Sequence, residues 1–78
     1  GENVPEIIGC DLQCEQAKHA ALVAAIEICE QQQDYVSRAL LEQQKHENEE
    51  HWDWLETQQE LIADMGLHNY LQSAAQED

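Results

Sequence analysis

Apolar residues recur every three or four positions along most of this chain, and that spacing predicts helices. The stretch from Cys10 to Met65 contains no glycine or proline, the residues that most often interrupt a helix. Its one clear polar break is "EQQQDYVSR", where Asp34 is a suitable N-cap for the apolar run that follows. Gly66 stands where a glycine would end the second helix. The pattern therefore predicts helices over about 5–32 and 34–64, a short helix over 67–73, and a frayed tail over 74–78.

Two long helices joined by a short break indicate an all-α fold, a long antiparallel hairpin plus a short C-terminal helix, forming one helical unit over residues 1–78. At 1.5 Å per residue, each long helix is roughly 40–45 Å in length. One hairpin of that length cannot enclose a core by itself. The sequence therefore predicts half of a four-helix bundle, completed by a second copy or by a different chain.

The residues expected to face inward, which we call the seam of each helix, follow alternating steps of three and four. In the first helix these residues are Ile8, Leu12, Glu15, His19, Leu22, Ile26 and Cys29. In the second helix they are Leu41, Gln44, Asn48, His51, Leu55, Gln58, Ile62 and Met65. Both series are polar in the middle. Burying a carboxylate that has no partner costs roughly several kcal/mol. A proton or a positive group should therefore accompany Glu15.

Two interpretations of this polar layer are open. Inward polar side chains are often ordinary core or edge residues that satisfy one another. A glutamate facing an asparagine and a histidine is also the arrangement of a metal site in a helical bundle, in which oxygen and imidazole ligands converge. The candidate ligands are Glu15 and His51, with Asn48, or Glu47 at the edge of the seam, as a further ligand. We expect His46, by contrast, to point into solvent.

The acids that surround these candidates mostly lie on the side of the helix that faces away from the candidate metal site. At about 100° per residue, Glu49 and Glu50 fall more than a quarter of a turn from the inward direction, so both are predicted to be solvated. The formal net charge of −14 argues against nucleic acid and anionic membranes as partners, because both are bound by clusters of Lys and Arg. An acidic run is also a common solubilising surface, so charge alone does not identify a metal site.

Cysteine number and hydropathy bear on the compartment. The three cysteines, Cys10, Cys14 and Cys29, are odd in number and lie within a helical pattern. This favours free thiols in a reducing, cytoplasmic compartment. No apolar run approaches the roughly 20 residues of a transmembrane helix.

Several separate stretches of the chain closely resemble the C-terminal half of bacterioferritins. They are "DLQCEQAK" (11–18), "DYVSR" (34–38), "HWDWLE" (51–56) and "MGLHNYLQS" (65–73), within a similarity over about residues 4–73. The resemblance implies a ferritin-like four-helix bundle in a 24-subunit-type cage that stores iron. It also implies a di-iron ferroxidase site, at which Fe(II) is oxidised by dioxygen or peroxide, and haem bound between subunits.

Carried over by position, the resemblance matches Glu15 to a bridging carboxylate of the di-iron site and His51 to the histidine of a Glu-x-x-His motif. Asn69 and Gln72 match polar positions near the channels of such cages. The sequence departs from the family at Asn48, which stands where the motif has a glutamate and is a neutral ligand that cannot bridge two irons. Glu47 would have to substitute if the site is to remain active.

The first two helices of the family have no counterpart in this sequence, and with them the haem-ligating methionine, for which Met65 is no substitute. The resemblance therefore predicts an iron-storage subunit that contributes half of a di-iron site and is completed by the missing N-terminal half as a separate chain, or by a second copy. The alternative is a non-catalytic structural subunit with a degenerate metal site.

Overall fold

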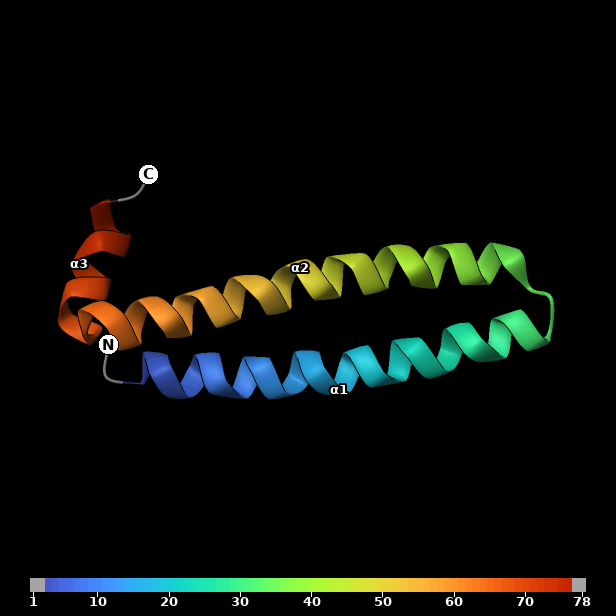
Figure 1. Ribbon diagram of the computed structural model, residues 1–78, viewed down its shortest axis with the longest axis horizontal. Coiled ribbons are helices and arrows are strands. Elements are labelled where there is room, and N and C mark those ends of the chain that lie inside the picture. Colours follow the sequence, from blue (N-terminus) through green and yellow to red (C-terminus); the bar gives the residue numbers. More distant parts are fainter. Residues whose placement is uncertain (1–2, 77–78) are drawn as a thin grey trace.

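The fold is a long helical hairpin with a short helix at its open end (Figure 1). The computed structural model describes residues 3–76. Helix α1 (Val4–Gln31) runs antiparallel to α2 (Tyr35–Met65), and α3 (Leu67–Gln76) turns away from the axis of α2 and packs against it. The molecule measures 51 × 23 × 17 Å, so its length is set by the two long helices. The all-α hairpin with a short C-terminal helix that the sequence predicts is confirmed.

Local signals place the ends of the helices. Asp34 caps α2, because its Oδ1 accepts a hydrogen bond from the backbone N–H of Ser37 at 3.1 Å. The preceding turn is closed by Gln33, which adopts the left-handed region with φ 57°. Gly66 ends α2 with φ 82°, and its N–H donates to the carbonyl oxygen of Ile62 at 2.8 Å. Asp34 and Gly66 therefore act as the sequence predicts.

The C-terminal helix is longer than the sequence pattern predicts. Residues 74–76, expected to belong to a frayed tail, continue α3 as far as Gln76. Ala74 and Ala75 have the highest intrinsic helix propensity, which explains why the helix does not end at Ser73. Residues 77 and 78 of the predicted tail lie outside the described residues.

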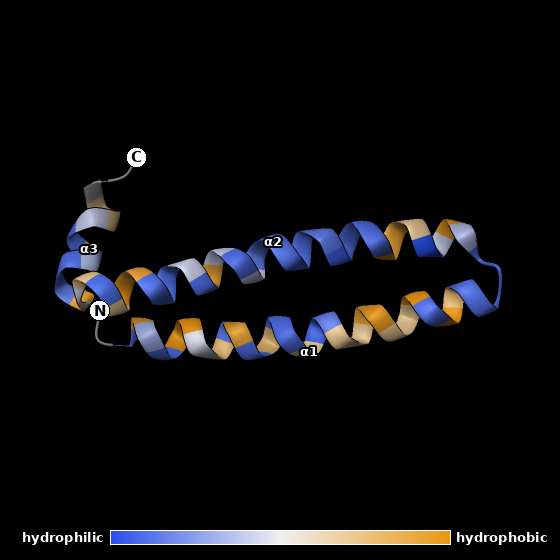
Figure 2. Ribbon diagram, in the orientation of Figure 1, coloured by the Kyte–Doolittle hydropathy of each residue, from blue (hydrophilic) through white to orange (hydrophobic). Residues whose placement is uncertain are grey.

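The hydrophobic core is small and lies between α1 and α2. Ile8, Leu12 and Leu55 form its centre, and Leu22 is buried further along the hairpin. Several large apolar side chains are exposed: Ile7, Ile28, Tyr35, Val36, Leu40, Trp54 and Leu61. Figure 2 shows apolar bands in both halves of α1 with a short hydrophilic stretch between them, whereas the middle of α2 is hydrophilic over a longer stretch. Four buried apolar side chains among residues 3–75 are few for a stable domain, since small chains bury a small fraction of their surface.

The α1 seam agrees with the prediction, but the α2 seam is rotated. Every predicted α1 seam residue is buried or partly buried. On α2, Gln44 and His51 are exposed, while the adjacent Lys45 and Trp52 are partly buried and turn toward α1. The observed α2 seam is therefore Leu41, Lys45, Asn48, Trp52, Leu55, Gln58, Ile62 and Met65. The inward orientation predicted for Gln44 is thus wrong, because the steps between Leu41 and Asn48 are four and three rather than three and four.

Within residues 3–76, none of the three helices is both long enough and apolar enough to cross a lipid bilayer.

Candidate functional site

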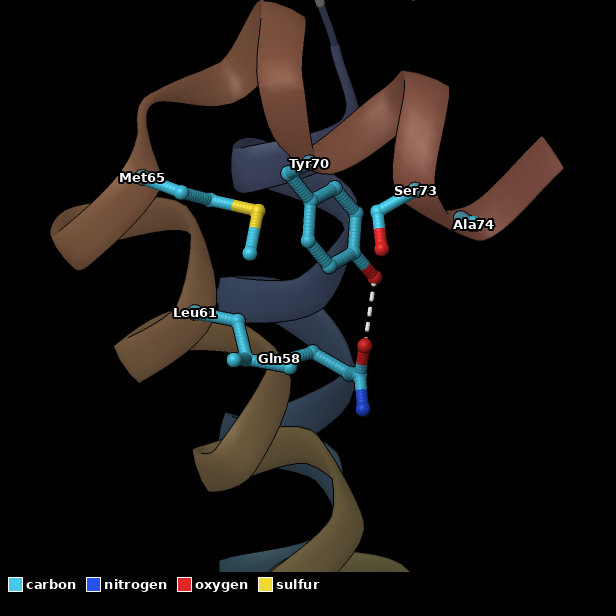
Figure 3. Close-up of a pocket in the computed structure, with 6 residues that line it drawn as sticks. All are labelled: Gln58, Leu61, Met65, Tyr70, Ser73 and Ala74. Atoms are coloured by element: carbon cyan, nitrogen blue, oxygen red, sulfur yellow. Dashed lines mark hydrogen bonds between the residues drawn. The ribbon is translucent and has the colours of Figure 1, made fainter. Parts of the chain in front are cut away.

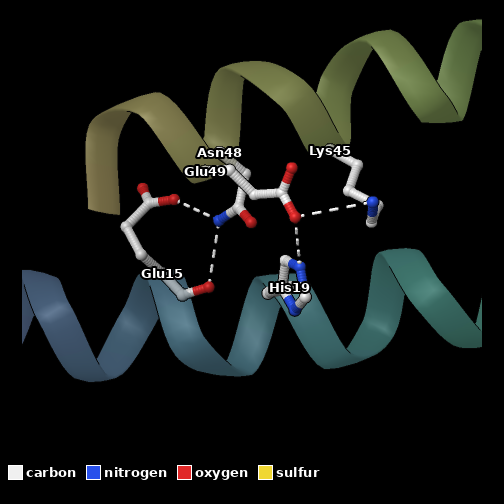
Figure 4. Close-up of polar contacts among 5 residues, drawn as sticks. All are labelled: Glu15, His19, Lys45, Asn48 and Glu49. Atoms are coloured by element: carbon white, nitrogen blue, oxygen red, sulfur yellow. Dashed lines mark hydrogen bonds and ion pairs between the residues drawn. The ribbon is translucent and has the colours of Figure 1, made fainter. Parts of the chain in front are cut away.

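A layer of polar side chains crosses the middle of the hairpin, in the place the sequence predicts. Glu15 and His19 contribute from α1, and Asn48, Glu49 and His51 from α2. Figure 4 shows four of these side chains, with Lys45, between the two helices. The layer divides into one cluster around Glu15 and a second around Glu49.

Asn48 is the buried centre of the first cluster, with 2% of its surface exposed. Its Nδ2 donates to the backbone carbonyl oxygen of Glu15 at 3.0 Å and to Glu15 Oε2 at 2.5 Å. Its Oδ1 is buried and has no hydrogen-bond partner in the structure. The amide therefore points its donor at Glu15 and leaves an unused acceptor inside the hairpin.

His51 completes the first cluster from the open edge of the hairpin. Its Nδ1 lies 2.9 Å from Glu15 Oε1, and its side chain is 49% exposed, against 14% for Glu15. The hydrogen bond from His51 lowers the pKa of the Glu15 carboxyl, and the bond from Asn48 acts in the same direction against the opposing effect of burial. Glu15 is therefore held as a carboxylate with both oxygens engaged. Because Nδ1 faces Glu15, Nε2 is the ring nitrogen that remains to bind a ligand.

The second cluster was not predicted from the sequence. Glu49 is exposed, as expected, but its Oε2 reaches His19 Nε2 at 2.9 Å across the helix pair and Lys45 Nζ at 3.4 Å. The hydrogen bond from His19 lowers the pKa of the Glu49 carboxyl, assisted by the charge of Lys45. The antiparallel arrangement could have predicted this cluster. Residues that face each other in an antiparallel hairpin have nearly the same sum of residue numbers, and the pairs Glu15–His51 and His19–Glu49 meet that condition.

The two tryptophans lie beside different histidines. The ring of Trp52 meets that of His19 edge-on, with the centroids 5.5 Å apart. Trp54 stacks on His51, with centroids 6.2 Å apart, and is 54% exposed. An aromatic ring this exposed, next to a half-exposed histidine, is typical of a surface that another protein covers.

The remaining candidates are not brought into the layer. Glu47 is exposed, and His46 pairs with Glu50 on the outer surface of α2. Cys10 and Cys14 are exposed free thiols, and Cys29 is partly buried and also free. Among residues 3–76, no group of three or more His, Cys, Asp or Glu side chains is arranged to hold a metal ion. The chain therefore brings Glu15, Asn48 and His51 together, but not Glu47.

A separate pocket lies at the elbow between α2 and α3 (Figure 3). Tyr70 donates a hydrogen bond from its hydroxyl to Gln58 Oε1 at 2.6 Å, and Met65 lines the same hollow. Asn69 Nδ2 donates to the carbonyl oxygen of Met65 at 3.0 Å, which ties α3 to the end of α2. Gln72 is exposed. These contacts hold the elbow in shape and are not part of the polar layer.

The comparisons of this chain with known proteins agree with one another. A sequence model described as the ferritin-like domain matches residues 1–65. A protein named bacterial ferritin from Pseudomonas aeruginosa is 51% identical over 74 residues, which are 94% of this chain and 48% of that protein. The bacterial ferritin of Synechocystis sp. is 49% identical over 74 residues, 94% of this chain and 47% of its own length.

A bacterioferritin from Brucella melitensis is 39% identical over 70 residues, which cover 90% of this chain and 44% of that protein. The chain thus spans about half the length of the curated relatives it matches.

Proposed function

This chain belongs to the ferritin-like domain family, and we propose that it supplies half of an iron-binding four-helix bundle in an iron-storage protein. The supporting observation is the 2.9 Å contact between Glu15 and His51, which brings a carboxylate and an imidazole from two helices to one edge of the hairpin. Oxygen and imidazole nitrogen are suitable ligands for iron. Glu15 and His51 are the two residues of this chain that we assign to the metal.

The rest of the ligand set has to come from outside the hairpin. Two side chains cannot fill the coordination sphere of an iron ion. The curated relatives are about twice as long as this chain, which leaves room for a second hairpin. Leu40, Trp54 and Leu61 are exposed on the side of α2 that carries His51, because Leu40 precedes His51 by eleven residues and Trp54 and Leu61 follow it by three and ten. A second hairpin packed there would cover these side chains and reach His51.

We assign that second hairpin to a missing N-terminal half, or to a second copy of the chain. In either case iron is the substrate: two Fe(II) ions each give one electron to dioxygen, which is reduced to peroxide. Assembly into a 24-subunit-type cage, with haem bound by a residue outside this chain, is part of the same proposal and rests on the family alone. The role of Glu15 and His51 is to hold Fe(II), and Glu47 would have to rotate inward to join them.

A second candidate function is favoured by Asn48. Its Nδ2 donates to Glu15 and so occupies the space in front of the carboxylate that a metal would otherwise fill. An amide is a neutral ligand that cannot bridge two cations as a carboxylate does. With that hydrogen bond in place, the chain would serve as a structural subunit with a degenerate metal site.

Oxidation of Fe(II) separates the two functions. The assembled protein, in which this chain is paired with the helices that complete the bundle, is loaded anaerobically with Fe(II), and the absorbance of Fe(III) is followed after oxygen is added. We expect oxidation faster than in buffer, reduced by Glu15→Gln and by His51→Ala but unaffected by Glu50→Gln on the outer surface. Oxidation no faster than in buffer, together with its appearance in Asn48→Glu, would establish the structural function.

Native mass measurement identifies the partner. A mass equal to an even multiple of this chain indicates completion by a second copy. A complex that contains a different helical chain indicates the missing N-terminal half. A monomer that binds no iron would overturn the proposal.

A further inference from the structure

The side-chain amide of Asn48 has one end fully used and the other end unused. Its Nδ2 donates to two oxygens of Glu15, the backbone carbonyl oxygen at 3.0 Å and Oε2 at 2.5 Å. Its Oδ1 is buried and has no hydrogen-bond partner among the residues that the structure describes, and the whole residue is 2% exposed. Buried polar atoms are nearly always hydrogen-bonded in proteins. An unpaired acceptor at this depth therefore indicates that the amide has a second use.

The two ends of an amide have almost the same shape. A half-turn of the amide plane exchanges the nitrogen for the oxygen and leaves the volume of the side chain nearly unchanged. A buried asparagine can therefore make this rotation without repacking of its neighbours. Figure 4 shows that the nitrogen of Asn48 points at Glu15, while the oxygen points to the side on which the Glu49 carboxylate lies. After a half-turn the oxygen would face Glu15, and the nitrogen would be turned toward that second carboxylate.

Glu15 determines which end of the amide faces it. With the amide reversed, Oδ1 of Asn48 would lie where Nδ2 lies now, against the carbonyl oxygen and Oε2 of Glu15. Three acceptors with no donor among them repel one another, so the present orientation is favoured while no cation is bound. A divalent cation reverses the preference, because backbone carbonyl, carboxylate and amide oxygens are all suitable ligands for it, whereas an amide nitrogen is not. Binding of a cation beside Glu15 therefore favours the reversed amide.

We propose that the Asn48 amide is a two-position switch, which donates to Glu15 while no metal is bound and turns its oxygen toward Glu15 when a divalent cation binds there. The switch presupposes the proposed function, in which Glu15 and His51 hold Fe(II). It gives Asn48 a role other than that of a permanent block in front of the carboxylate. Nδ2 gives up two hydrogen bonds when the amide turns, so the apparent affinity for the cation is lowered by the population of the unturned amide. The site therefore binds Fe(II) reversibly.

The affinity for Mn(II) alone tests the switch, because Mn(II) accepts the same oxygen ligands. Mn(II) is added to the assembled protein, and the free ion is measured by electron paramagnetic resonance. Asn48→Leu keeps the size of the side chain and removes both the donor and the oxygen. We expect it to raise the dissociation constant of the Glu15 site by about tenfold or more, because a ligand is lost. If Asn48 only blocks the carboxylate, Asn48→Leu should bind Mn(II) more tightly. Tighter or unchanged binding would overturn the switch.

Two further variants separate the switch from the proposed function. If Glu15→Gln binds Mn(II) as tightly as the parent, Glu15 does not hold the metal, and the proposed function fails together with the switch. If Glu15→Gln weakens binding but Asn48→Leu does not, the switch alone fails. The matched control is Asn69→Leu, the same replacement in α3, where Asn69 contacts Met65 and lies outside the polar layer. It should bind Mn(II) as the parent does, and a loss equal to that of Asn48→Leu would overturn the switch.

Infrared spectroscopy observes the amide itself and leaves Asn48 in place, so it serves even if Asn48→Leu fails to assemble. The chain has three asparagines, Asn3, Asn48 and Asn69. Asn3→Ser and Asn69→Leu together leave Asn48 as the one asparagine, and this chain is labelled with carbon-13 at the asparagine side-chain carbonyl before assembly. We expect the labelled carbonyl band to move to lower frequency when Mn(II) is added, because coordination through oxygen weakens the C=O bond. A band that stays in place at saturating Mn(II) would overturn the switch.

Discussion

Asn48 and Glu15 are joined by two hydrogen bonds from one amide nitrogen, to the carbonyl oxygen of Glu15 at 3.0 Å and to its Oε2 at 2.5 Å. This pair links the two long helices at mid-length, between the core around Leu55 and the buried Leu22. It also decides how the carboxylate is used, because an amide donor stands where the resemblance to bacterioferritins places a second carboxylate. We therefore expect the identity of residue 48 to affect both the stability of the hairpin and the use of the Glu15 carboxylate as a metal ligand.

Replacing that amide by a carboxylate of the same shape should destabilise the metal-free chain. Asn48→Asp removes the donor and places a second negative charge beside Glu15, at a cost of about 1–3 kcal/mol. We expect a lower urea midpoint, followed by far-UV circular dichroism, and its recovery when Mn(II) is added. Glu50→Gln, at an exposed position on the outer surface of α2, should change neither the midpoint nor its response to Mn(II). An Asn48→Asp chain that is as stable as the parent and indifferent to Mn(II) would contradict the role assigned to this pair.

The small core makes a single leucine important. Leu55 is 2% exposed and lies at the centre of the contact with Ile8 and Leu12. Leu55→Ala should lower the free energy of unfolding by about 2–5 kcal/mol, enough to unfold much of a hairpin with so few buried side chains. Leu40→Ala is the matched control, since Leu40 is 59% exposed and its loss should have little effect in the isolated chain. Similar urea midpoints for the two variants would show that the core lies elsewhere.

The two glycines of the described residues should respond in opposite directions to alanine. Gly66 has φ 82°, a conformation that is strained for a residue with a Cβ, so Gly66→Ala should cost about 1–3 kcal/mol. Gly9 lies inside α1, and a Cβ there would meet no atom within 4 Å. Gly9→Ala should therefore stabilise the chain by about 0.5–1 kcal/mol. Thermal unfolding of both variants checks the pair, and a stabilising Gly66→Ala would show that α2 does not end as described.

The cap at the start of α2 should make stability depend on pH. The hydrogen bond from Ser37 lowers the pKa of the Asp34 carboxyl, so its contribution is present above the ordinary Asp pKa of about 3.9 and is lost as the pH falls through the lowered value. Asp34→Asn keeps an acceptor for the cap but does not titrate. As the pH falls from neutral to acidic, the melting temperature of the parent should therefore fall further than that of Asp34→Asn.

Asp34→Ala removes the cap and should melt at a lower temperature than either chain at neutral pH. If the parent and Asp34→Asn keep a constant difference over the whole pH range, the carboxylate of Asp34 contributes nothing as a charged cap.

Local features of the sequence were sufficient to predict the helices. Asp34 and Gly66 have specific backbone roles that depend on few neighbours, so the break between α1 and α2 and the end of α2 follow from them. The α1 seam was also predictable, because its apolar residues are regularly spaced. The end of α3 was predicted too early, since alanine carries no periodic signal although it favours a helix.

The α2 seam shows where periodicity alone fails. Between Leu41 and Leu55 this helix has few apolar residues, so steps of three and four fit several rotations of the helix equally well. The observed rotation replaces Gln44 and His51 by Lys45 and Trp52 in the contact with α1. It leaves His51 half exposed at the edge, where it contacts Glu15 from the side.

The sequence by itself determined that this chain is helical, where its helices break, and that its polar residues gather at mid-length. Those properties depend on intrinsic propensity, capping and spacing, which act over a few residues. Only the tertiary structure decided which polar side chains meet: Asn48 donates to Glu15, and Glu49 reaches His19 across the hairpin. The rotation of one helix against another is fixed by side-chain packing along their whole length, and no short stretch of sequence contains that information.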